Sequence, residues 1–170
     1  TSNRDARLPL AAQFVPVSIW TTIRLAAEVP RVDVDVTVAN AASDHRLSVH
    51  FPTGILTDEG LLDGHFEIAH RSIILQDGVE TVDWVELPSA DAWHQGFVTV
   101  LGADSGLTIA TRGLPQAALA ASPYGCEIII TLLRCIGWLN RTDLPNRHGS
   151  RGPELEIPGA QGVGEFHWAY

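Results

Sequence analysis

The chain has 170 residues, is 45% hydrophobic and carries a formal net charge of -9, so it can bury the core of one ordinary domain without disulfides or a structural metal. The acidic balance and the lack of any basic run argue against nucleic acid as a partner. No apolar run reaches the roughly 18 to 20 residues of a membrane span and no signal peptide is recognisable, so we expect no membrane partner.

Strands dominate the predicted secondary structure, because apolar residues recur at every second position. The clearest case is 31–40, where four valines on one face alternate with charged and polar residues on the other. In chain order, the predicted strands are 17–25, 31–40, 46–51, 65–70, 82–87, 96–101, 106–112, 126–134 and 165–170. Short Gly, Pro, Asp and Asn turns separate them, which is typical of an antiparallel sandwich or barrel.

Three segments depart from simple alternation. The segment 114–122 (LPQAALAAS) is followed by a proline and could form a short helix or a surface loop. Asp58 and Glu59 are expected in a turn. The segment 126–134 is apolar on both faces, which predicts a central strand covered on both sides. No repeat or linker divides the chain, so the sequence predicts one all-β domain over 1–170.

Two cysteines, Cys126 and Cys135, are too few for a disulfide framework. Nine residues apart on one extended strand, they are expected on opposite faces. We predict two buried, reduced thiols, which suits a cytoplasmic location. The chain contains no methionine, so we expect it to be processed or excised from a longer protein.

Seven histidines suggest a metal site, but their spacing does not support one. His65 and Glu67 share a strand face, yet no set of three or four ligands converges, and solvated strand residues are favoured. Asp91 and His94 flank Trp93 near a strand start, where a solvated surface is again the favoured interpretation. The sequence contains no nucleophile elbow and no glycine-rich phosphate loop, so it assigns no catalytic residue.

The segment 138–161 is the remaining candidate for a functional surface. It contains Arg141, Arg147, Arg151, Asp143 and Glu154 directly after the most buried predicted strand. Long loops often carry function, and these side chains can bind sugar hydroxyls or orient a carboxylate. Five tryptophans add surfaces on which sugars stack, although tryptophan in a sandwich is more often part of the core.

Several stretches are spread along nearly the whole chain: 21–54, 66–73, 94–100, 106–116 and 130–170, with DHRLSVHFPTG, TRGLP, LLRCIGWLNRTDL and GPELEIPGAQ among them. They resemble the carboxy-terminal β domain of glycoside hydrolase family 38, the α-mannosidases. The resemblance implies an all-β, antiparallel β-supersandwich of the galactose-mutarotase-like kind. It also implies that this domain packs on an amino-terminal catalytic domain of the same polypeptide.

In that family the nucleophile, the acid/base carboxylate and the zinc ligands belong to the amino-terminal part, and their motifs are absent from this sequence. The resemblance therefore implies a parent enzyme that hydrolyses mannosides with retention, through a covalent intermediate on one carboxylate. Zinc is implied for the missing catalytic domain. For this chain it implies no cofactor, no catalytic residue and no activity in isolation.

Some members of the family send a basic loop from this domain into the cleft, and LNRTDLPNR is the matching stretch. The resemblance implies that Arg141 reaches the mannoside substrate or the catalytic carboxylates, with Asp143 holding its guanidinium. Pairing of the two residues only within the loop is an equal alternative. Gln161 is a second substrate-cleft candidate. The family often has a cysteine where this chain has Gly162, so no role of that thiol carries over.

Three other interpretations stay open. A stand-alone carbohydrate-binding module would expose a row of aromatic side chains and bind sugar by itself. An epimerase on the same architecture would need paired histidines and a carboxylate in one cleft, which the histidine spacing does not favour. A purely structural packing domain would have no residue in contact with substrate.

Overall fold

The computed structural model describes residues 14–73, 89–142 and 152–170. In these residues the secondary structure consists of strands and one short 3-10 helix, η1 (Pro158–Gln161). The strands are β1 (Ser18–Leu25), β2 (Val32–Asn40), β3 (Arg46–Pro52), β4 (Glu59–Asp63), β5 (Ile68–Ser72), β6 (Asp91–Trp93), β7 (Phe97–Leu101), β8 (Gly106–Ala110), β9 (Gln116–Ser122), β10 (Gly125–Arg134) and β11 (Gly164–Ala169). The chain is therefore all-β, as predicted.

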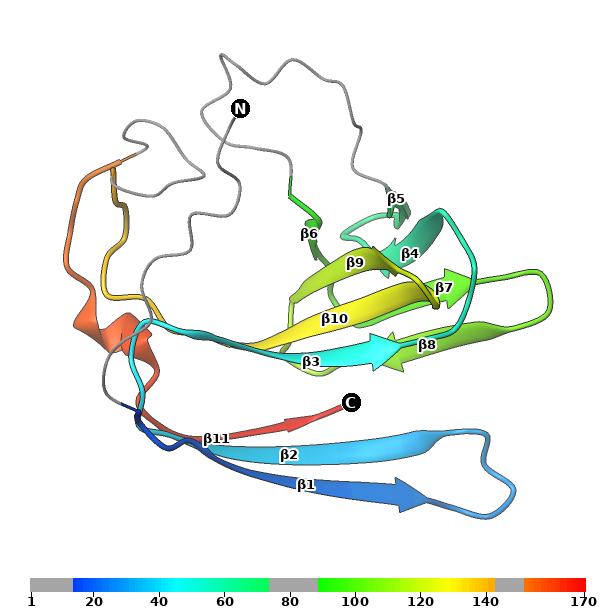
Figure 1. Ribbon diagram of the computed structural model, residues 1–170, viewed down its shortest axis with the longest axis horizontal. Coiled ribbons are helices and arrows are strands. Elements are labelled where there is room, and N and C mark those ends of the chain that lie inside the picture. Colours follow the sequence, from blue (N-terminus) through cyan, green and yellow to red (C-terminus); the bar gives the residue numbers. More distant parts are fainter. Residues whose placement is uncertain (1–13, 74–88, 143–151) are drawn as a thin grey trace.

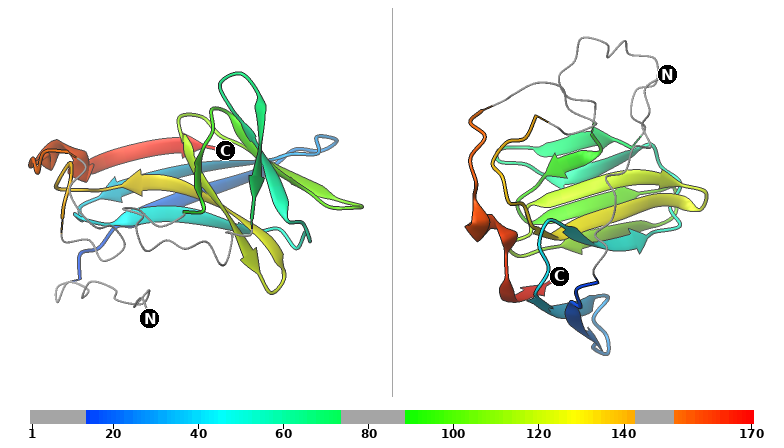
Figure 2. Two further views of the ribbon diagram at one scale, coloured as in Figure 1. Left: turned by 90° about the horizontal axis from the view of Figure 1, so that it is seen from above. Right: turned by 60° about the vertical axis from the view of Figure 1, so that its left-hand side comes forward.

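Three antiparallel sheets contain all the described strands. Sheet A has the order β1-β2-β11, sheet B the order β3-β10-β9-β6 and sheet C the order β5-β4-β7-β8. Figures 1 and 2 show sheet A on the β3 side of sheet B, with β1 at its outer edge. The antiparallel pairing agrees with a β-sandwich; the more specific galactose-mutarotase-like assignment stays a prediction.

One hydrophobic core joins the three sheets, because each sheet contributes the apolar face of its strands to it. Val38 of sheet A, Ile128 and Ile130 of sheet B and Val98 of sheet C are all fully buried in one cluster. β10 supplies the centre of sheet B, between β3 and β9, as its apolar sequence predicts. On its other face Thr131 is buried and Ile129 is half-buried.

The segment expected as a helix or loop, 114–122, is instead mostly strand β9, and that prediction is wrong. Its residues Ala117 and Leu119 are almost completely buried and pair with Ile130 and Ile128 of β10. Alanine has a high helix propensity, but β9 also pairs with β6 on its other side. Two neighbouring strands and a buried apolar face outweigh the local preference, because propensity is a weak determinant beside tertiary packing.

The expected turn at Glu59 is also wrong, since Glu59 begins β4. Gly60 is the second residue of this strand, and a Cβ there would come within 2.4 Å of the Cδ1 atom of Leu119. The glycine thus marks a close approach of sheet C to sheet B, a known use of glycine inside strands. The strand expected over 65–70 lies later, at β5, and the strand expected over 82–87 falls outside the described residues.

Both cysteines are free and buried, as predicted. Burial raises the pKa of the Cys126 thiol, and the nearby Glu127 carboxylate raises it further. Burial also raises the pKa of the Cys135 thiol, which lies 3.5 Å from the Asn40 amide nitrogen. Neither thiol is therefore a ready nucleophile.

Strand β1 is the exposed edge of sheet A. Its partner β2 buries Val36 and Val38, whereas every residue of β1 is exposed. Ile23 and Leu25, which share a sheet face with Val34, are 69% and 76% exposed. An apolar sheet face thus extends beyond the core. In the described parts of the chain, no helix is long and apolar enough to span a membrane.

Candidate functional site

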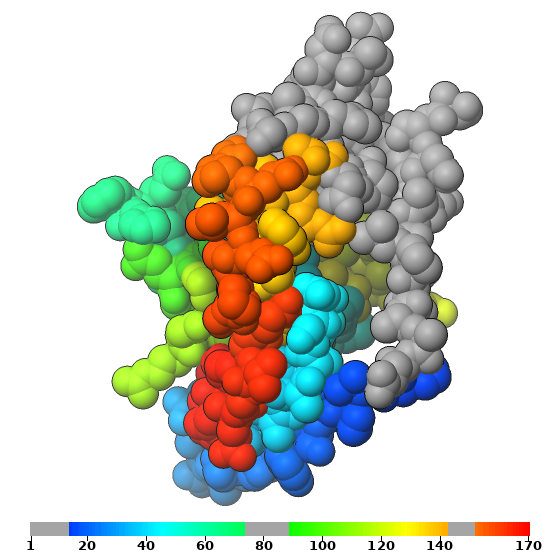
Figure 3. Space-filling view, turned by 90° about the vertical axis from the view of Figure 1, so that its left-hand side faces the viewer, coloured from blue at the N-terminus to red at the C-terminus, as the bar shows by residue number. Residues whose placement is uncertain are grey.

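The segment after β10 forms a paired arm, not an irregular loop. Its two legs are 137–142 and 152–157. The Leu139 amide donates to the Leu155 carbonyl at 2.9 Å, and the Ile157 amide donates to the Gly137 carbonyl at 2.8 Å. Between these bonds, Trp138 and Glu156 form an antiparallel bridge. The legs lie side by side at one end of the molecule, the second leg in orange in Figures 1 and 3.

Side chains extend the pairing toward the tip of the arm. The buried Asn140 donates from its side-chain amide to the Gly152 carbonyl at 3.1 Å. The Thr142 hydroxyl donates to the Glu154 carboxylate at 2.7 Å. These two contacts hold the two legs together at Thr142 and Gly152, where the described parts of the arm end.

The base of the arm is closed by a polar contact that we call the Gln161 clamp, formed by Gln161, Asp44 and Gly137. The Gln161 side-chain amide donates to the Asp44 Oδ1 atom at 2.8 Å, and the Asp44 backbone amide donates back to Gln161 Oε1 at 2.7 Å. The Gly137 amide donates to the same Asp44 oxygen at 3.1 Å. The clamp joins three segments: the β2–β3 turn, the first leg and η1.

The close fit of the clamp explains one glycine of the arm. A Cβ at Gly137 would lie 2.8 Å from Gln161 Nε2 and 3.4 Å from Asp44 Oδ1. Asn40, at the end of β2, adds to the same junction by donating from its side-chain amide to the Gly162 carbonyl at 2.7 Å. The base of the arm is therefore fixed by hydrogen bonds to the end of β2 and to the turn between β2 and β3.

The three residues predicted from the sequence as cleft candidates have different positions. Arg141 lies near the tip of the first leg and is partly buried. Asp143, with the proposed Arg141–Asp143 pair, falls outside the described residues. Gln161 lies at the base of the arm, with its side chain engaged in the clamp. Arg141 and Gln161 thus belong to one structural unit but to its opposite ends.

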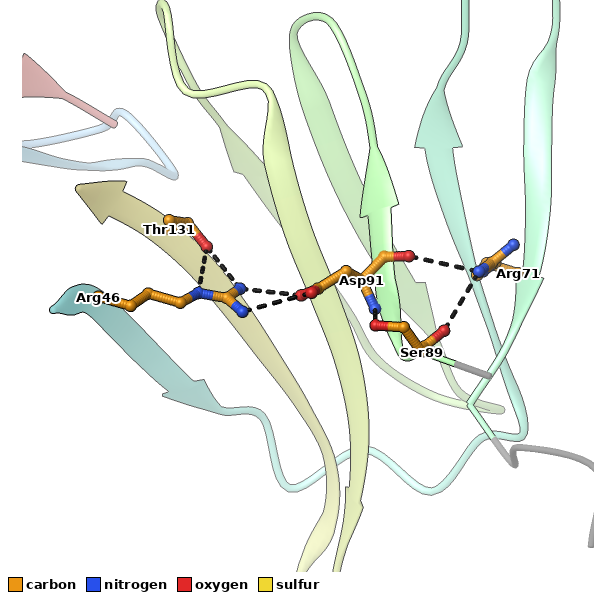
Figure 4. Close-up of polar contacts among 5 residues, drawn as sticks. All are labelled: Arg46, Arg71, Ser89, Asp91 and Thr131. Atoms are coloured by element: carbon orange, nitrogen blue, oxygen red, sulfur yellow. Dashed lines mark hydrogen bonds and ion pairs between the residues drawn. The ribbon is translucent and has the colours of Figure 1, made fainter. Parts of the chain in front are cut away.

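A second polar network crosses the outer face of sheet B and was not predicted from the sequence (Figure 4). The Arg46 guanidinium binds both oxygens of the Asp91 carboxylate, at 2.9 and 3.3 Å, and donates to the Thr131 hydroxyl at 2.6 and 3.0 Å. Arg71 of β5 donates to the backbone carbonyls of Ser89 and Asp91. The network connects β3, β10 and β6 and reaches β5 of sheet C.

The position of this network favours a structural role. Arg46 and Asp91 come from the two edge strands of sheet B, so their contact spans the sheet. Their side chains are only about one-third exposed, at 38% and 35%. Each of the three guanidinium nitrogens of Arg46 makes a hydrogen bond within the network, and the bidentate contact with Asp91 fixes the guanidinium plane. We assign Asp91 to this bracing network, not to catalysis.

Histidines form pairs with carboxylates but no metal centre in the described residues. His50 contacts Glu127, and His70 contacts Glu59, each at 3.2 Å between a ring nitrogen and a carboxylate oxygen. Both pairs are cross-strand contacts on sheet surfaces. Among the described side chains, no group of three His, Cys, Asp or Glu residues is placed to hold a metal ion.

One histidine contradicts the expectation of a solvated surface. His94, which directly follows β6, is 4% exposed. Its sequence neighbours, Asp91 and Trp93, gave no sign of this burial, because a three-residue strand is too short to establish an alternation.

Comparison with known proteins places this architecture among glycoside hydrolases. The chain superposes on an α-mannosidase from Enterococcus faecalis V583 with a TM-score of 0.73 and 28% identity, covering 94% of this chain and 16% of that one. A family 38 glycosyl hydrolase protein from Enterococcus faecalis gives a TM-score of 0.72 and 26% identity over the same shares. A protein named "Putative mannosylglycerate hydrolase" from Halalkalibacterium halodurans is 28% identical over 135 residues, which is 79% of this chain and 14% of that protein.

No protein-family model matches the chain. The resemblance to family 38 stated from the sequence is confirmed by the structural neighbours, which match almost all of the chain at 26% and 28% identity. This chain is homologous to these α-mannosidases and spans 16% of their length, so it corresponds to a small part of each.

Proposed function

We propose that this chain is the carboxy-terminal β domain of an α-mannosidase-type glycoside hydrolase. In this proposal the domain packs on the catalytic domain of the same polypeptide and extends its arm into the substrate cleft. The homology to α-mannosidases over 94% of the chain supports the enzyme class. The paired arm, which carries Arg141 on a fixed root, is the observation that supports a role at the cleft.

The structure of the arm suits a residue that must be held in position. Two backbone hydrogen bonds and one bridge pair the legs, and the Gln161 clamp fixes the base. Preorganised groups bind a substrate or transition state better than mobile ones, because little ordering entropy is lost on binding. An arm that merely connected η1 to β10 would not need this number of contacts.

The arm also presents apolar surface. Trp138, Leu139 and Leu155 are 40%, 54% and 55% exposed, and all three lie on its legs. Exposed apolar side chains gathered on one projecting element are typical of a docking surface. We propose that these residues contact the catalytic domain and so direct the tip of the arm.

The exposed face of β1 is the second proposed contact with the rest of the polypeptide. Ile23 and Leu25 lie on the apolar face of sheet A but outside its core. Full burial of one such side chain contributes about 1.5–3 kcal/mol. Relatives in which the matching segment is 16% of the chain have ample additional polypeptide to cover this face.

The chemistry open to this chain is binding and orientation. An arginine guanidinium donates up to five hydrogen bonds, accepts none and stays charged. Arg141 would therefore orient a carboxylate or hold sugar hydroxyls, whereas proton transfer and nucleophilic attack belong to carboxylates outside this chain. The described residues do not fit a zinc ion, so we assign no zinc ligand to them.

The test uses the full-length enzyme that contains this chain. Arg141→Ala and Arg141→Lys are assayed on an aryl α-mannoside and on a mannose disaccharide, with kcat and KM measured separately. We expect Arg141→Ala to lower kcat/KM by about 10²- to 10³-fold, the range for loss of one preorganised charged donor. Arg141→Lys should keep only part of the wild-type kcat/KM, because lysine has the charge but lacks the planar guanidinium group.

The matched control is Arg31→Ala. The turn between β1 and β2 lies at the end of the molecule opposite the arm (Figure 1). Arg31 belongs to this connection, and its guanidinium pairs with Asp33. Its loss should leave both constants unchanged. Wild-type kcat and KM in Arg141→Ala would contradict the cleft role and leave a purely structural packing domain as the better account.

A further inference from the structure

A pocket of about 510 Å³ lies away from the arm, where the ends of β4 and β6 meet the segment before β9. It is lined by Asp63 at the end of β4, Trp93 at the end of β6, Leu114, and His65 and His94, which follow these two strands. None of these residues belongs to the arm. The pocket is therefore a separate feature, and the argument from it does not depend on the proposed function of the arm.

The strand ends that form the pocket are fixed by backbone hydrogen bonds. The His94 amide donates to the Pro115 carbonyl at 2.9 Å, and the Gln95 amide donates to the Asp63 carbonyl at 2.9 Å. These bonds tie β6 to sheet C on one side and to the start of β9 on the other. The floor includes Leu114, which is 2% exposed. The walls are thus held in place without a ligand.

His94 is the unusual member of the pocket. It is 4% exposed, yet neither of its ring nitrogens has a hydrogen-bond partner in the described parts of the chain. Buried polar groups in folded proteins are almost always paired, so an orphaned imidazole at a pocket wall needs an explanation. Both ring nitrogens are closed to solvent in this structure, so a ligand in the pocket pairs with them only by displacing the atoms that cover the ring.

The charge state of the pocket narrows the class of ligand. Burial lowers the pKa of His94, against a smaller opposing effect of the Asp63 carboxylate, so the ring is neutral at neutral pH. A neutral imidazole has one donor and one acceptor nitrogen. An anion is disfavoured by Asp63, and an ammonium group, which only donates, leaves the donor nitrogen of the ring unpaired. A hydroxyl group can donate or accept, so it pairs with either nitrogen in either tautomer.

Trp93 indicates the shape of that ligand. Its indole lines the pocket and is 66% exposed, which is unusual for a side chain that gains so much from burial. An exposed aromatic surface beside buried polar groups fits a ring with one apolar face and polar edges. Gln95, another wall residue, adds an amide that can donate and accept.

We propose that this pocket is a carbohydrate-binding subsite. It takes an uncharged sugar ring, with hydroxyl groups on the His94 imidazole and the Gln95 amide and the apolar face of the ring on the Trp93 indole. The side chains of Asp63 and His65 lie at the wall as further partners for hydroxyl groups. The subsite holds sugar and performs no chemistry on it.

The test is a titration of the full chain with methyl α-D-mannopyranoside and with methyl α-D-glucopyranoside. NMR signals of the tryptophan indoles and the histidine rings are recorded at each sugar concentration. We expect saturable shifts of the Trp93 and His94 signals, with a Kd on the order of millimolar, typical of one sugar unit in a shallow site. Inorganic phosphate should cause no such shifts, because the site repels anions.

Three variants make the outcome decisive. Trp93→Ala changes an exposed side chain, so it should fold normally and bind sugar at least about tenfold more weakly. His94→Phe should weaken binding similarly while keeping the volume of the ring. Arg31→Ala should bind as the wild type does.

Absence of saturable shifts at either signal would overturn the proposal. So would binding that survives both pocket substitutions, or binding of phosphate with equal affinity. Activity of the full-length enzyme on small substrates should be unaffected by Trp93→Ala. The failure of this subsite is therefore distinguishable from the failure of the arm's role, which Arg141→Ala tests.

Discussion

The Gln161 clamp allows a quantitative prediction, because Gln161→Glu changes one atom of the side chain and reverses one interaction. In the native chain the Gln161 amide donates to the Asp44 carboxylate at 2.8 Å. In the variant, two carboxylates would face each other across this contact. Two unit charges about 4 Å apart repel by about 1 kcal/mol in water and about 4 kcal/mol at an effective dielectric constant of 20. Gln161 is half-buried and Asp44 is exposed, so the clamp lies between these limits and we expect a loss of about 2 kcal/mol at pH 8.

The loss should depend on pH in a defined direction. When protonated, the introduced carboxyl donates to Asp44 as the amide did, so the folded state favours its protonated form. Its pKa in the folded state should therefore lie above the unfolded value of about 4.3, by about 1.5 units for a 2 kcal/mol penalty. Between about pH 4.3 and 6 the folded state binds more protons than the unfolded state, and stability falls as pH rises. Near pH 4 the deficit should almost vanish.

Urea unfolding from pH 4 to 8 measures this effect in the wild type, Gln161→Glu and Gln161→Leu. The leucine variant removes both side-chain hydrogen bonds without adding charge, so it should lose about 1–2 kcal/mol at every pH. Hydrogen exchange at the Gly137 amide, which also donates to Asp44, reports the clamp locally. Wild-type stability of Gln161→Glu at pH 8, or the same pH profile in both variants, would refute the reasoning.

Three further predictions concern the sheets and the thiols. Gly60→Ala should cost about 1–3 kcal/mol in urea unfolding, because the added Cβ would lie 2.4 Å from the buried Leu119. Leu119→Val in the same chain should recover part of that loss, and strictly additive effects would contradict the clash. Asp91→Ala should lower the free energy of unfolding by only about 0.5–1.5 kcal/mol, because the Arg46 guanidinium that binds it is partly solvated. A loss well above this range would show that the network stabilises sheet B more than its solvent exposure suggests. Because burial raises the pKa of both thiols, Cys126 and Cys135 should react slowly with a thiol reagent at pH 8 and rapidly in urea, and prompt modification of the native chain would count against this account.

Much of the fold follows from local sequence, where alternation and turns coincide. Strands β2, β7, β8 and β11 were predicted within one or two residues, since each has a clear period of two between polar turns. β9 could not be predicted, because its alanines favour a helix and only pairing with β10 and β6 overrides them. β4 was missed for a related reason: its glycine signals a turn locally but fits the approach of Leu119, 59 residues further on.

The candidate site was less accessible to sequence reasoning than the fold. The composition of 138–161 indicates a functional surface, but the pairing of its legs depends on contacts that no short pattern shows. Gln161 bonds to Asp44, 117 residues away in sequence. His94 gave no sign of its burial, because the pocket around it comes from three separate strand ends. Long-range partners, not residue types, were the missing information.

The paired legs also determine how freely the tip of the arm can vary among related proteins. Because Asn140 bonds to Gly152 and Thr142 to Glu154, the two ends of any segment inserted between them are already brought together. Doubling the length of such a segment adds only about 0.6 kcal/mol of closure entropy, less than a typical hydrogen bond contributes. Evolution or design can therefore lengthen, shorten or replace the segment between Thr142 and Gly152 while the sheets that carry the arm remain unchanged.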